Sequence, residues 1–384
     1  MQFPQNLKEK LDIRKTQNAF RSLSRSNKLI DFASNDYLGF SSSQAIFNAT
    51  HHYLITHNTI HNGATGSRLL TGNHNLYYET EHFIAIFHQS ETALIYNSGY
   101  DANIGFFSSV PQKNDFILFD ELSHASIRDG ILMSNAKSYR FQHNDFEDLE
   151  RLIQFCKKNK TSETTNIYVV TESVFSMDGD TPNLAKLVTI CEKNHCFLVV
   201  DEAHALGVFG NSGEGLVQDL NLQDKIFARL ITFGKSLGCH GAAILGSQDL
   251  KDYLVNFSRS FIYSTGLSPH SVATIFTAYQ YLEKNTGEVQ QLKSNINIFN
   301  QQKTILSLKP LFVRSKSAIQ SAIIPGNEKV KSIAKIIQEN GFDVKAILSP
   351  TVPKGQERLR FCLHSYNSEK EIIGVLNLLN KLKM

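Results

Sequence analysis

Between about residue 50 and residue 270, short apolar runs alternate with stretches of helical periodicity, and this alternation constrains the fold more than any other feature. The apolar runs, each typical of a buried strand, are Ala93–Tyr96, Phe116–Phe119, Ile167–Val170, Phe197–Val200, Arg229–Thr232 and Ala242–Leu245. The helical stretches among them are Leu76–His88, Asp145–Lys157, Leu184–Asn194 and Leu250–Phe257. Strands that alternate with helices in this way form βαβ units. We therefore predict an α/β fold with a mainly parallel central sheet and helices on both faces.

The two ends of the chain follow other patterns. Residues 1–30 predict an amphipathic helix, and Ile30–Phe40 predicts a strand and a turn. Beyond Pro269 a long helical stretch is expected to run to about Leu306. A strand is expected next, followed by a helix, a strand and a helix at Lys329–Asn340, Glu357–Leu363 and Lys370–Leu382. The predicted parts are an N-terminal helix and arm (1–50), a large domain (51–275), and a linking helix with a smaller C-terminal α+β domain (276–384).

Composition and charge narrow the class of protein. Of the 384 residues, 41% are hydrophobic and 20% are charged, and the formal net charge of +3 gives no electrostatic footprint for nucleic acid or an anionic membrane. There is no apolar run of about 18 residues and no apolar N-terminal core, so neither a membrane span nor a signal peptide is expected. The five cysteines form no CxxC pair, which argues against a metal site or a redox dithiol and favours the reducing cytoplasm.

Reactive side chains follow three of the predicted strands. Lys235 lies just beyond one of them, between glycines. Asp201 and His204 follow a second, and Ser176 follows a third. Open parallel sheets bind their ligands outside the carboxyl ends of the strands. The sequence therefore predicts a binding site that brings these groups together.

An amine, a carboxylate, an imidazole and hydroxyls match the needs of pyridoxal phosphate. Its aldehyde forms a Schiff base with a lysine, and its ring nitrogen needs a carboxylate because only the protonated ring is a strong electron sink. Lys235 fits the first role and Asp201 the second. The turn Asn97–Asn103, between a strand and a helix, suits the phosphate because helix N-termini bind anions. Further groups for the phenolic oxygen and for hydrogen bonding are His204, Ser176 and Thr232.

Each of these residues alone has an ordinary interpretation, as a solvated lysine or a turn carboxylate, so the joint pattern carries the argument. One other class of protein has similar sequence motifs. Asp201–His204 spells the DEAH signature of a helicase, and Gly234-Lys235-Ser236 ends like a phosphate-binding P-loop. A P-loop requires a glycine where Arg229 stands, and it should precede the DEAH segment rather than follow it. We therefore reject a nucleotide triphosphatase.

Several motifs, spread over nearly the whole chain, resemble those of the α-oxoamine synthase family of fold-type I pyridoxal-phosphate enzymes. The matching stretches are Ser34–Gly39, Gly63–Arg68, Asp120–Ile127, Ser173–Gly179, Asp201–Gly207, Thr232–Lys235 and Pro350–Pro353. Their number and order make the resemblance specific. Within the family the chain is most similar to the branch that acts in biotin synthesis. The family's reaction is the decarboxylative condensation of an amino acid with an acyl thioester.

The resemblance implies roles for individual residues. Lys235 carries the cofactor and moves protons at the substrate α-carbon, His124 stacks on the pyridine ring next to the substrate, and Asp201 holds the ring nitrogen. The other residues implied to hold the cofactor are Gly99, Tyr100, Ser176, His204 and Thr232.

Further implied contacts involve the substrates and a second subunit. Asn35 and Arg360 would orient the amino-acid carboxylate; Arg358 lies on the same strand face, and spacing alone does not choose between the two arginines. The remaining implied residues are Arg21 and Thr351, at substrate-contacting positions, and Ser264 and Thr265, which reach the phosphate across a homodimer interface.

The sequence departs from the family at one position. Many members of the biotin branch and of the aminoketobutyrate-ligase branch have an arginine two residues before the Pro-Thr-Val-Pro stretch, where this chain has Leu348. This difference leaves open how an acyl carboxylate such as that of a pimeloyl group is bound. It also leaves open the sister reactions with glycine, serine or cysteate and other acyl thioesters, whether carried by coenzyme A or by a carrier protein. A non-catalytic relative is disfavoured because Lys235 and Asp201 are both present.

Overall fold

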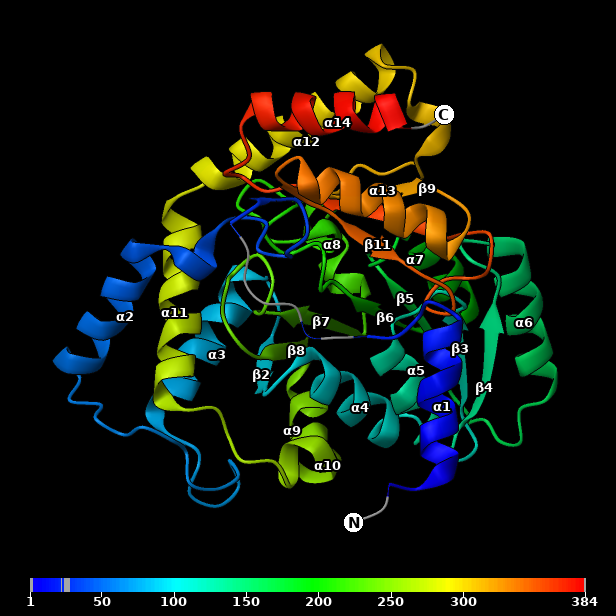
Figure 1. The fold of residues 1–384 in the computed structure, drawn as a ribbon. Coiled ribbons are helices and arrows are strands. Elements are labelled where there is room, and N and C mark those ends of the chain that lie inside the picture. The colour runs from blue at the N-terminus through cyan, green and yellow to red at the C-terminus, as the bar shows by residue number, and fades with distance from the viewer. Residues whose placement is uncertain (1–2, 22, 24–27, 383–384) are drawn as a thin grey trace. The chain divides into compact units, whose positions relative to one another are not determined.

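Two structural units divide the chain in the computed structural model, which describes residues 3–21, 23 and 28–382 (Figure 1). The large unit comprises residues 35–176 and 181–291. The small unit comprises residues 1–34, 177–180 and 292–384. Within the described residues, the helices are all too short or too polar to cross a membrane.

A seven-stranded sheet forms the centre of the large unit. Its strands, in the order β2-β8-β7-β6-β5-β3-β4, are all parallel except β8, which runs antiparallel to both neighbours. The strands are β2 (Thr92–Tyr96), β3 (Phe116–Asp120), β4 (Lys137–Phe141), β5 (Ile167–Glu172), β6 (Phe197–Asp201), β7 (Ala228–Thr232) and β8 (Ala242–Gly246). Every apolar run expected to be a strand is one, and the mainly parallel sheet is confirmed.

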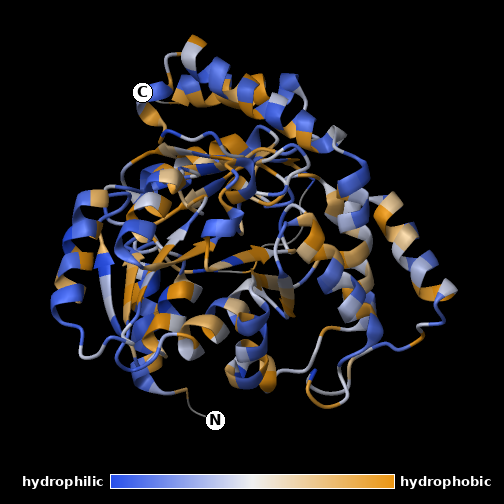
Figure 2. Ribbon diagram, turned by 180° about the vertical axis from the view of Figure 1, so that it is seen from behind, coloured by the Kyte–Doolittle hydropathy of each residue, from blue (hydrophilic) through white to orange (hydrophobic). Residues whose placement is uncertain are grey.

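Helices pack on both faces of this sheet, as predicted. The helices of the large unit are α2 (Gln44–Thr56), α3 (Asn75–Phe87), α4 (Gly99–Ser109), α5 (Ala125–Leu132), α6 (Phe146–Lys158), α7 (Leu184–Asn194), α8 (Leu216–Asp219), α9 (Gln248–Phe257), α10 (Arg259–Ile262) and α11 (Pro269–Lys284), with short 3-10 turns at Phe40–Ser42 and Gln223–Lys225. Of these, α2 packs against α11. Successive residues of a strand point to opposite faces of the sheet. Val199 lies in the hydrophobic cluster with α4, α5, α9 and α10, and Val200 lies in the cluster with α6, α7 and α8. Figure 2 shows that the central strands are mostly hydrophobic and that the covering helices carry both hydrophobic and hydrophilic residues. Burial of such side chains, each worth about 1.5–3 kcal/mol, stabilises the layered arrangement.

The small unit is α+β, as expected. Its sheets are an antiparallel one in the order β11-β12-β9 and a parallel pair of β1 with β10. Its strands are β1 (Ile30–Asp31), β9 (Ile319–Ile323), β10 (Phe342–Asp343), β11 (Lys345–Ile347) and β12 (Arg358–Cys362). Its helices are α1 (Gln5–Thr16), most of α12 (Gly287–Ile305), α13 (Asn327–Glu339) and α14 (Glu369–Leu382), with a 3-10 turn at Lys309–Leu311.

Two predicted helices differ from the structure. The N-terminal helix expected over residues 1–30 is α1, which ends at Thr16 because Asn18 takes a left-handed conformation; residues 1, 2, 22 and 24–27 of that prediction lie outside the described part. α1 buries none of its residues, so tertiary packing does not extend it. The long stretch expected to reach Leu306 is two helices, α11 and α12, because Asn285 is extended between them.

Candidate active site

A pocket of about 790 Å³ of open space lies at the carboxyl ends of the parallel strands in the large unit. Many of the predicted site residues line it: Asn35, Gly99, Tyr100, His124, Asp201, His204, Thr232 and Lys235. They come from separate parts of the sequence and meet because parallel strands end at one edge of the sheet.

Lys235 is held in a tight turn directly after β7. The turn is closed by hydrogen bonds from Gly238 N–H to the Lys235 carbonyl (2.9 Å) and from Cys239 N–H to the Phe233 carbonyl (2.8 Å). The next side chain, Ser236, donates to the Leu206 carbonyl at 2.5 Å and fixes the turn against the loop after β6. These hydrogen bonds fix the backbone on both sides of Lys235.

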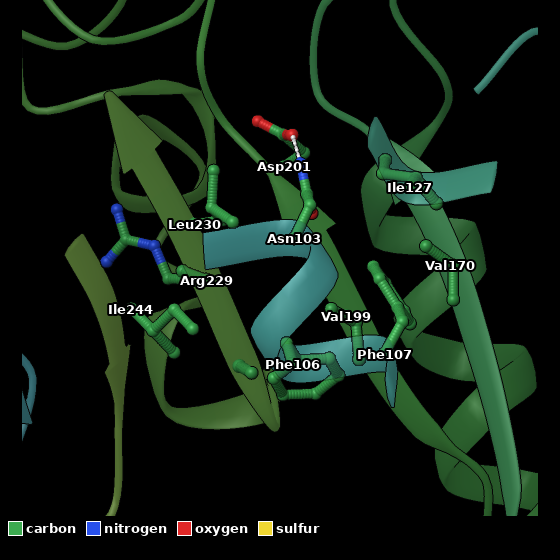
Figure 3. Close-up of a pocket in the computed structure, with 11 residues that line it drawn as sticks. Asn103, Phe106, Phe107, Ile127, Val170, Val199, Asp201, Arg229, Leu230 and Ile244 are labelled. Atoms are coloured by element: carbon green, nitrogen blue, oxygen red, sulfur yellow. Dashed lines mark hydrogen bonds between the residues drawn. The ribbon is translucent and has the colours of Figure 1, made fainter. Parts of the chain in front are cut away.

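Asp201 is the last residue of β6, and its two carboxylate oxygens have different partners. Oδ1 accepts from the Ala203 N–H at 2.9 Å, and Oδ2 accepts from Asn103 Nδ2 at 2.9 Å. Figure 3 shows Asn103 reaching from α4 toward Asp201, above a small apolar pocket lined by residues such as Phe106. The side-chain amide of Asn103, on α4, thus orients the Asp201 carboxylate.

His204 lies three residues further along the chain and is 5% exposed. Its Nδ1 is 2.7 Å from the hydroxyl of Tyr37, which itself donates to the Asn35 side-chain oxygen at 3.2 Å. Tyr37 is fully buried. Hydrogen bonds thus connect Asn35, Tyr37 and His204, and they orient the imidazole ring.

His124 lies at the start of α5, on a turn that two carboxyl groups hold in place. Its backbone N–H donates to Glu172 Oε1 at 2.6 Å. Asp120, at the end of β3, accepts from the Leu122 N–H at 2.8 Å and contacts His143 Nδ1 at 2.9 Å. Burial lowers the pKa of His124 below its usual value, although the charge of Asp201 opposes the shift. The neutral imidazole is therefore favoured near pH 7.

Glu172 ends β5 and pairs in register with Asp201 on β6. Its side chain is buried in the pocket wall. Burial, and then the charge of Asp201, raise the pKa of Glu172 well above its usual value, while Lys235 acts in the opposite direction. Glu172 therefore tends to keep its proton.

The first turn of α4 supplies backbone N–H groups at the pocket. The Ser98 hydroxyl caps this helix by accepting from the Asp101 N–H at 3.0 Å. Gly99 is required here because a Cβ would come within 2.6 Å of the Thr232 methyl carbon. The start of α4 lines the pocket beside Thr232, and the helix dipole favours an anion at such an N-terminus.

Other predicted residues do not line this pocket in the described structure. They are Ser176, Ser264 and Thr265 of the large unit. Arg21, Thr351 and Arg360 belong to the small unit. Thr265 forms a β-bridge with Ser67. Within the small unit, Arg21 donates to the Thr351 hydroxyl at 3.2 Å. Arg358 forms a buried ion pair with Asp178.

Sequence reasoning missed four groups that complete the site. They are Tyr37, Asn103, Ser126 and Glu172. Signals for three of them were present: Tyr37 and Ser126 stand within the matched stretches Ser34–Gly39 and Asp120–Ile127, and Glu172 follows the predicted strand Ile167–Val170 by two residues. Asn103 and Ser126 act through contacts on helices α4 and α5, and no sequence pattern pointed to those contacts.

Comparisons with known proteins agree with this geometry. The family described as aminotransferase class I and II matches residues 27–376. An Emericella nidulans protein described as 8-amino-7-oxononanoate synthase is 38% identical over 90% of this chain and 87% of its own. The solved 8-amino-7-oxononanoate synthase of Francisella tularensis is 28% identical, with a TM-score of 0.77 over 93% of this chain and 98% of that chain. A solved Sphingomonas wittichii serine palmitoyltransferase is 26% identical, with a TM-score of 0.86 over 98% and 96%.

The sheet and its site define a fold-type I pyridoxal-phosphate enzyme. The residues fit that cofactor: an amine, a paired carboxylate, a buried imidazole and a capped helix N-terminus line one pocket. The chain belongs to the aminotransferase class I and II family and, within it, to the α-oxoamine synthases, which are acyl-transferring enzymes. Both the fold and the family expected from the sequence are confirmed.

Proposed function

We propose that this protein condenses L-alanine with a pimeloyl thioester, with loss of carbon dioxide and free thiol, to give 8-amino-7-oxononanoate. The observation that carries the proposal is the pocket at the strand ends, where Lys235, Asp201, His204 and His124 meet. The similarity to relatives described as 8-amino-7-oxononanoate synthase, over most of both chains, supports this choice of product.

Bound at Lys235, pyridoxal phosphate supplies an electron sink that stabilises negative charge at the amino-acid α-carbon. Asp201 would hold the ring nitrogen, and Asn103 keeps that carboxylate in place. The Lys235 amine, on its fixed turn, would move the α-proton. His124 would cover the ring, and its neutral form avoids placing a second positive charge beside Lys235. Holding base and substrates in register contributes to the rate, by up to roughly 7–11 kcal/mol.

The amino-acid carboxylate would bind to Asn35 and Arg360. Arg358 is already engaged in a buried ion pair with Asp178 and donates from Nε to the Gln356 carbonyl at 2.9 Å. This engagement gives Arg358 a structural role. The family resemblance points to Arg360 for the carboxylate, and a guanidinium suits a carboxylate. Replacing Arg360 by Lys should therefore raise the KM for the amino acid.

Replacing Lys235 by Ala tests the catalytic assignment. We expect the variant to lose turnover and to lose the long-wavelength absorbance of the lysine-bound cofactor, because no other amine follows β7 in this turn. Lys225→Ala is the matched control, because Lys225 is exposed and pairs with Glu192 at the surface. Normal turnover by the Lys235 variant would contradict the proposal.

Sister reactions with serine, glycine or cysteate form the second candidate, favoured by two observations. Leu348 stands where an acyl-carboxylate-binding arginine is expected, and a solved serine palmitoyltransferase has a TM-score of 0.86 with this chain. Spectral titration of the holoenzyme with L-alanine, glycine, L-serine and L-cysteate should give a response to L-alanine. Thiol release should then be faster from pimeloyl than from palmitoyl thioesters. A response confined to serine and palmitoyl thioester would replace the first candidate by the second.

A further inference from the structure

A second pocket lies wholly within the small unit, between the last turns of α12 and the segment that follows it. Its volume, including the open mouth, is about 1190 Å³. Three cations line it: Lys303, Lys309 and Arg314. The rest of the lining consists of amide and hydroxyl side chains, among them Asn297 and Gln301, and of the apolar Phe312 and Val313. We refer to it as the Lys303 pocket.

Lys303 is unusual because it is a buried cation, 4% exposed, paired with a neutral group. Its Nζ donates to Gln320 Oε1 at 2.6 Å and lies 4.8 Å from the Phe312 ring centroid and 5.6 Å from that of Phe299. Gln320 is itself fixed, since it is fully buried and donates to the Ser317 carbonyl at 2.9 Å. A buried ammonium without a carboxylate is costly, and rings and one amide oxygen offset only part of that cost.

The side chains that line the Lys303 pocket include no carboxylate. Among the residues that the structure describes, no carboxylate comes within 4.0 Å of Lys303, Lys309 or Arg314. The sequence shows the same bias over a longer stretch: residues 289–327 contain five lysines and arginines and no aspartate or glutamate. The end of α12 supplies only the partial negative charge of its last carbonyls. The pocket therefore has a net positive charge that its own residues leave uncompensated.

We propose that the Lys303 pocket binds a phosphate-class anion. Lys303 would meet the anion at the pocket floor, and Lys309 and Arg314 would meet it at the exposed rim. One arginine can donate to two phosphate oxygens at once, and each lysine adds a compact positive charge. This set of cations therefore suits a phosphoryl group better than a single carboxylate. Burial, and then the charge of Lys309, lower the pKa of Lys303 to about 8, so an anion would restore its proton.

Titration calorimetry of the holoenzyme with inorganic phosphate tests the proposal. In the holoenzyme the start of α4 would already hold the phosphate of the cofactor and would not compete for the added anion. Ionic strength is held constant with chloride. We expect saturable binding, a rise in Tm on the order of a few degrees, and proton uptake near pH 8.5, detected by comparing buffers of different ionisation enthalpy. Proton uptake distinguishes specific binding at Lys303 from general screening.

Variants locate the site. Lys303→Met keeps the apolar packing and should abolish both binding and proton uptake, while Arg314→Ala, at an exposed position, should weaken binding about ten-fold or more. Lys335→Ala is the charge-matched control, because Lys335 is 77% exposed on α13 of the same unit. Binding that is unchanged in Arg314→Ala and in Lys303→Met would overturn the proposal, and so would equal loss in Lys335→Ala. Arg314→Ala keeps the test valid should Lys303→Met fail to fold.

Two sources can supply the phosphoryl group, and a second ligand separates them. Adenosine 3′,5′-bisphosphate carries the same chemistry on a nucleotide. Binding about ten-fold tighter than inorganic phosphate, lost in Lys303→Met, would support a nucleotide-borne phosphate. Equal affinities would support the free anion. Absence of binding by both ligands would overturn the proposal whatever the enzyme's activity.

Discussion

Glu172 lies in the active-site wall between a carboxylate and an amine. Its position at the end of β5 places it beside Asp201, and its Oε1 accepts the His124 backbone N–H at 2.6 Å. Burial and Asp201 raise its pKa well above the usual value. Glu172 therefore positions His124 by a hydrogen bond that a neutral side chain can also make.

Replacing Glu172 by Gln should change the pH dependence of stability. The folded-state pKa is raised, so the folded protein holds this proton over a pH range in which the unfolded chain has lost it. The free energy of unfolding of the wild type should therefore fall as the pH rises from about 4.5 through the raised pKa, and the Gln variant should lack that contribution. Urea unfolding of the cofactor-free protein at several pH values measures the difference. Parallel pH curves for the two proteins would show that the assignment is wrong.

Glu172→Ala should behave differently from Glu172→Gln. The alanine removes the acceptor and leaves the His124 N–H unsatisfied near the pocket, which should cost about 1–3 kcal/mol of unfolding free energy. The kcat of Glu172→Ala should also fall more than that of Glu172→Gln, because the turn carrying His124 loses its support. Steady-state kinetics of the two variants makes the comparison, with Glu192→Gln, an exposed glutamate, as the control.

At the scale of elements, one buried ion pair joins several helices and strands of the large unit. Arg229 on β7 donates to Glu202 Oε2, just after β6, at 2.9 and 2.7 Å. Arg229 also donates to the His88 carbonyl at the end of α3, and Glu202 accepts from the Val217 N–H in α8. Glu202, the second residue of the DEAH segment, and Arg229, which excluded a P-loop, are therefore structural partners.

Glu202→Ala should destabilise the fold by about 3–5 kcal/mol, because it leaves the Arg229 guanidinium buried without its partner. The double variant Glu202→Leu with Arg229→Met should recover much of that loss, since it removes both charges. Glu192→Ala, at a surface pair with Lys225, should change the free energy by about 1 kcal/mol or less. Urea unfolding measures all three; additive losses in the double variant would rule out the coupling.

Some helices and strands could be predicted from the sequence, and others could not. The central strands were predictable because both faces are buried, as in the fully buried run of β5. β4 escaped prediction because it is an edge strand whose residues Lys137, Ser138 and Arg140 are exposed. α4 was expected only as a helix after a turn, since Gly99 and Asn103 serve the site rather than helix propensity. Lys235 and Asp201 were predictable from their place after strands, whereas the contact of Asn103 with Asp201 depends on how α4 packs.

At the scale of the whole molecule, the predicted homodimer remains a proposal, and the large unit offers support for it. Ser67 and Thr265 form a bridge, and exposed apolar side chains flank it on both segments. Leu70 is 82% exposed and Tyr263 is 72% exposed. Apolar side chains exposed at this level, gathered around one bridge, are typical of a protein interface. We expect the protein to sediment with about twice its chain mass of 43.2 kDa.

Mixing two inactive or weakened variants tests whether the active sites are shared. One variant is Lys235→Ala, and the other is Ser264→Ala with Thr265→Ala, which should bind the cofactor weakly. If Ser264 and Thr265 serve the partner's site, each mixed dimer contains one site with all of its native residues. An equal mixture, unfolded and refolded together, should then regain about one quarter of wild-type activity at low cofactor concentration. If these residues serve their own chain, no mixed dimer has a native site, and activity should stay at the average of the two variants. The assay therefore decides between a shared and a self-contained site.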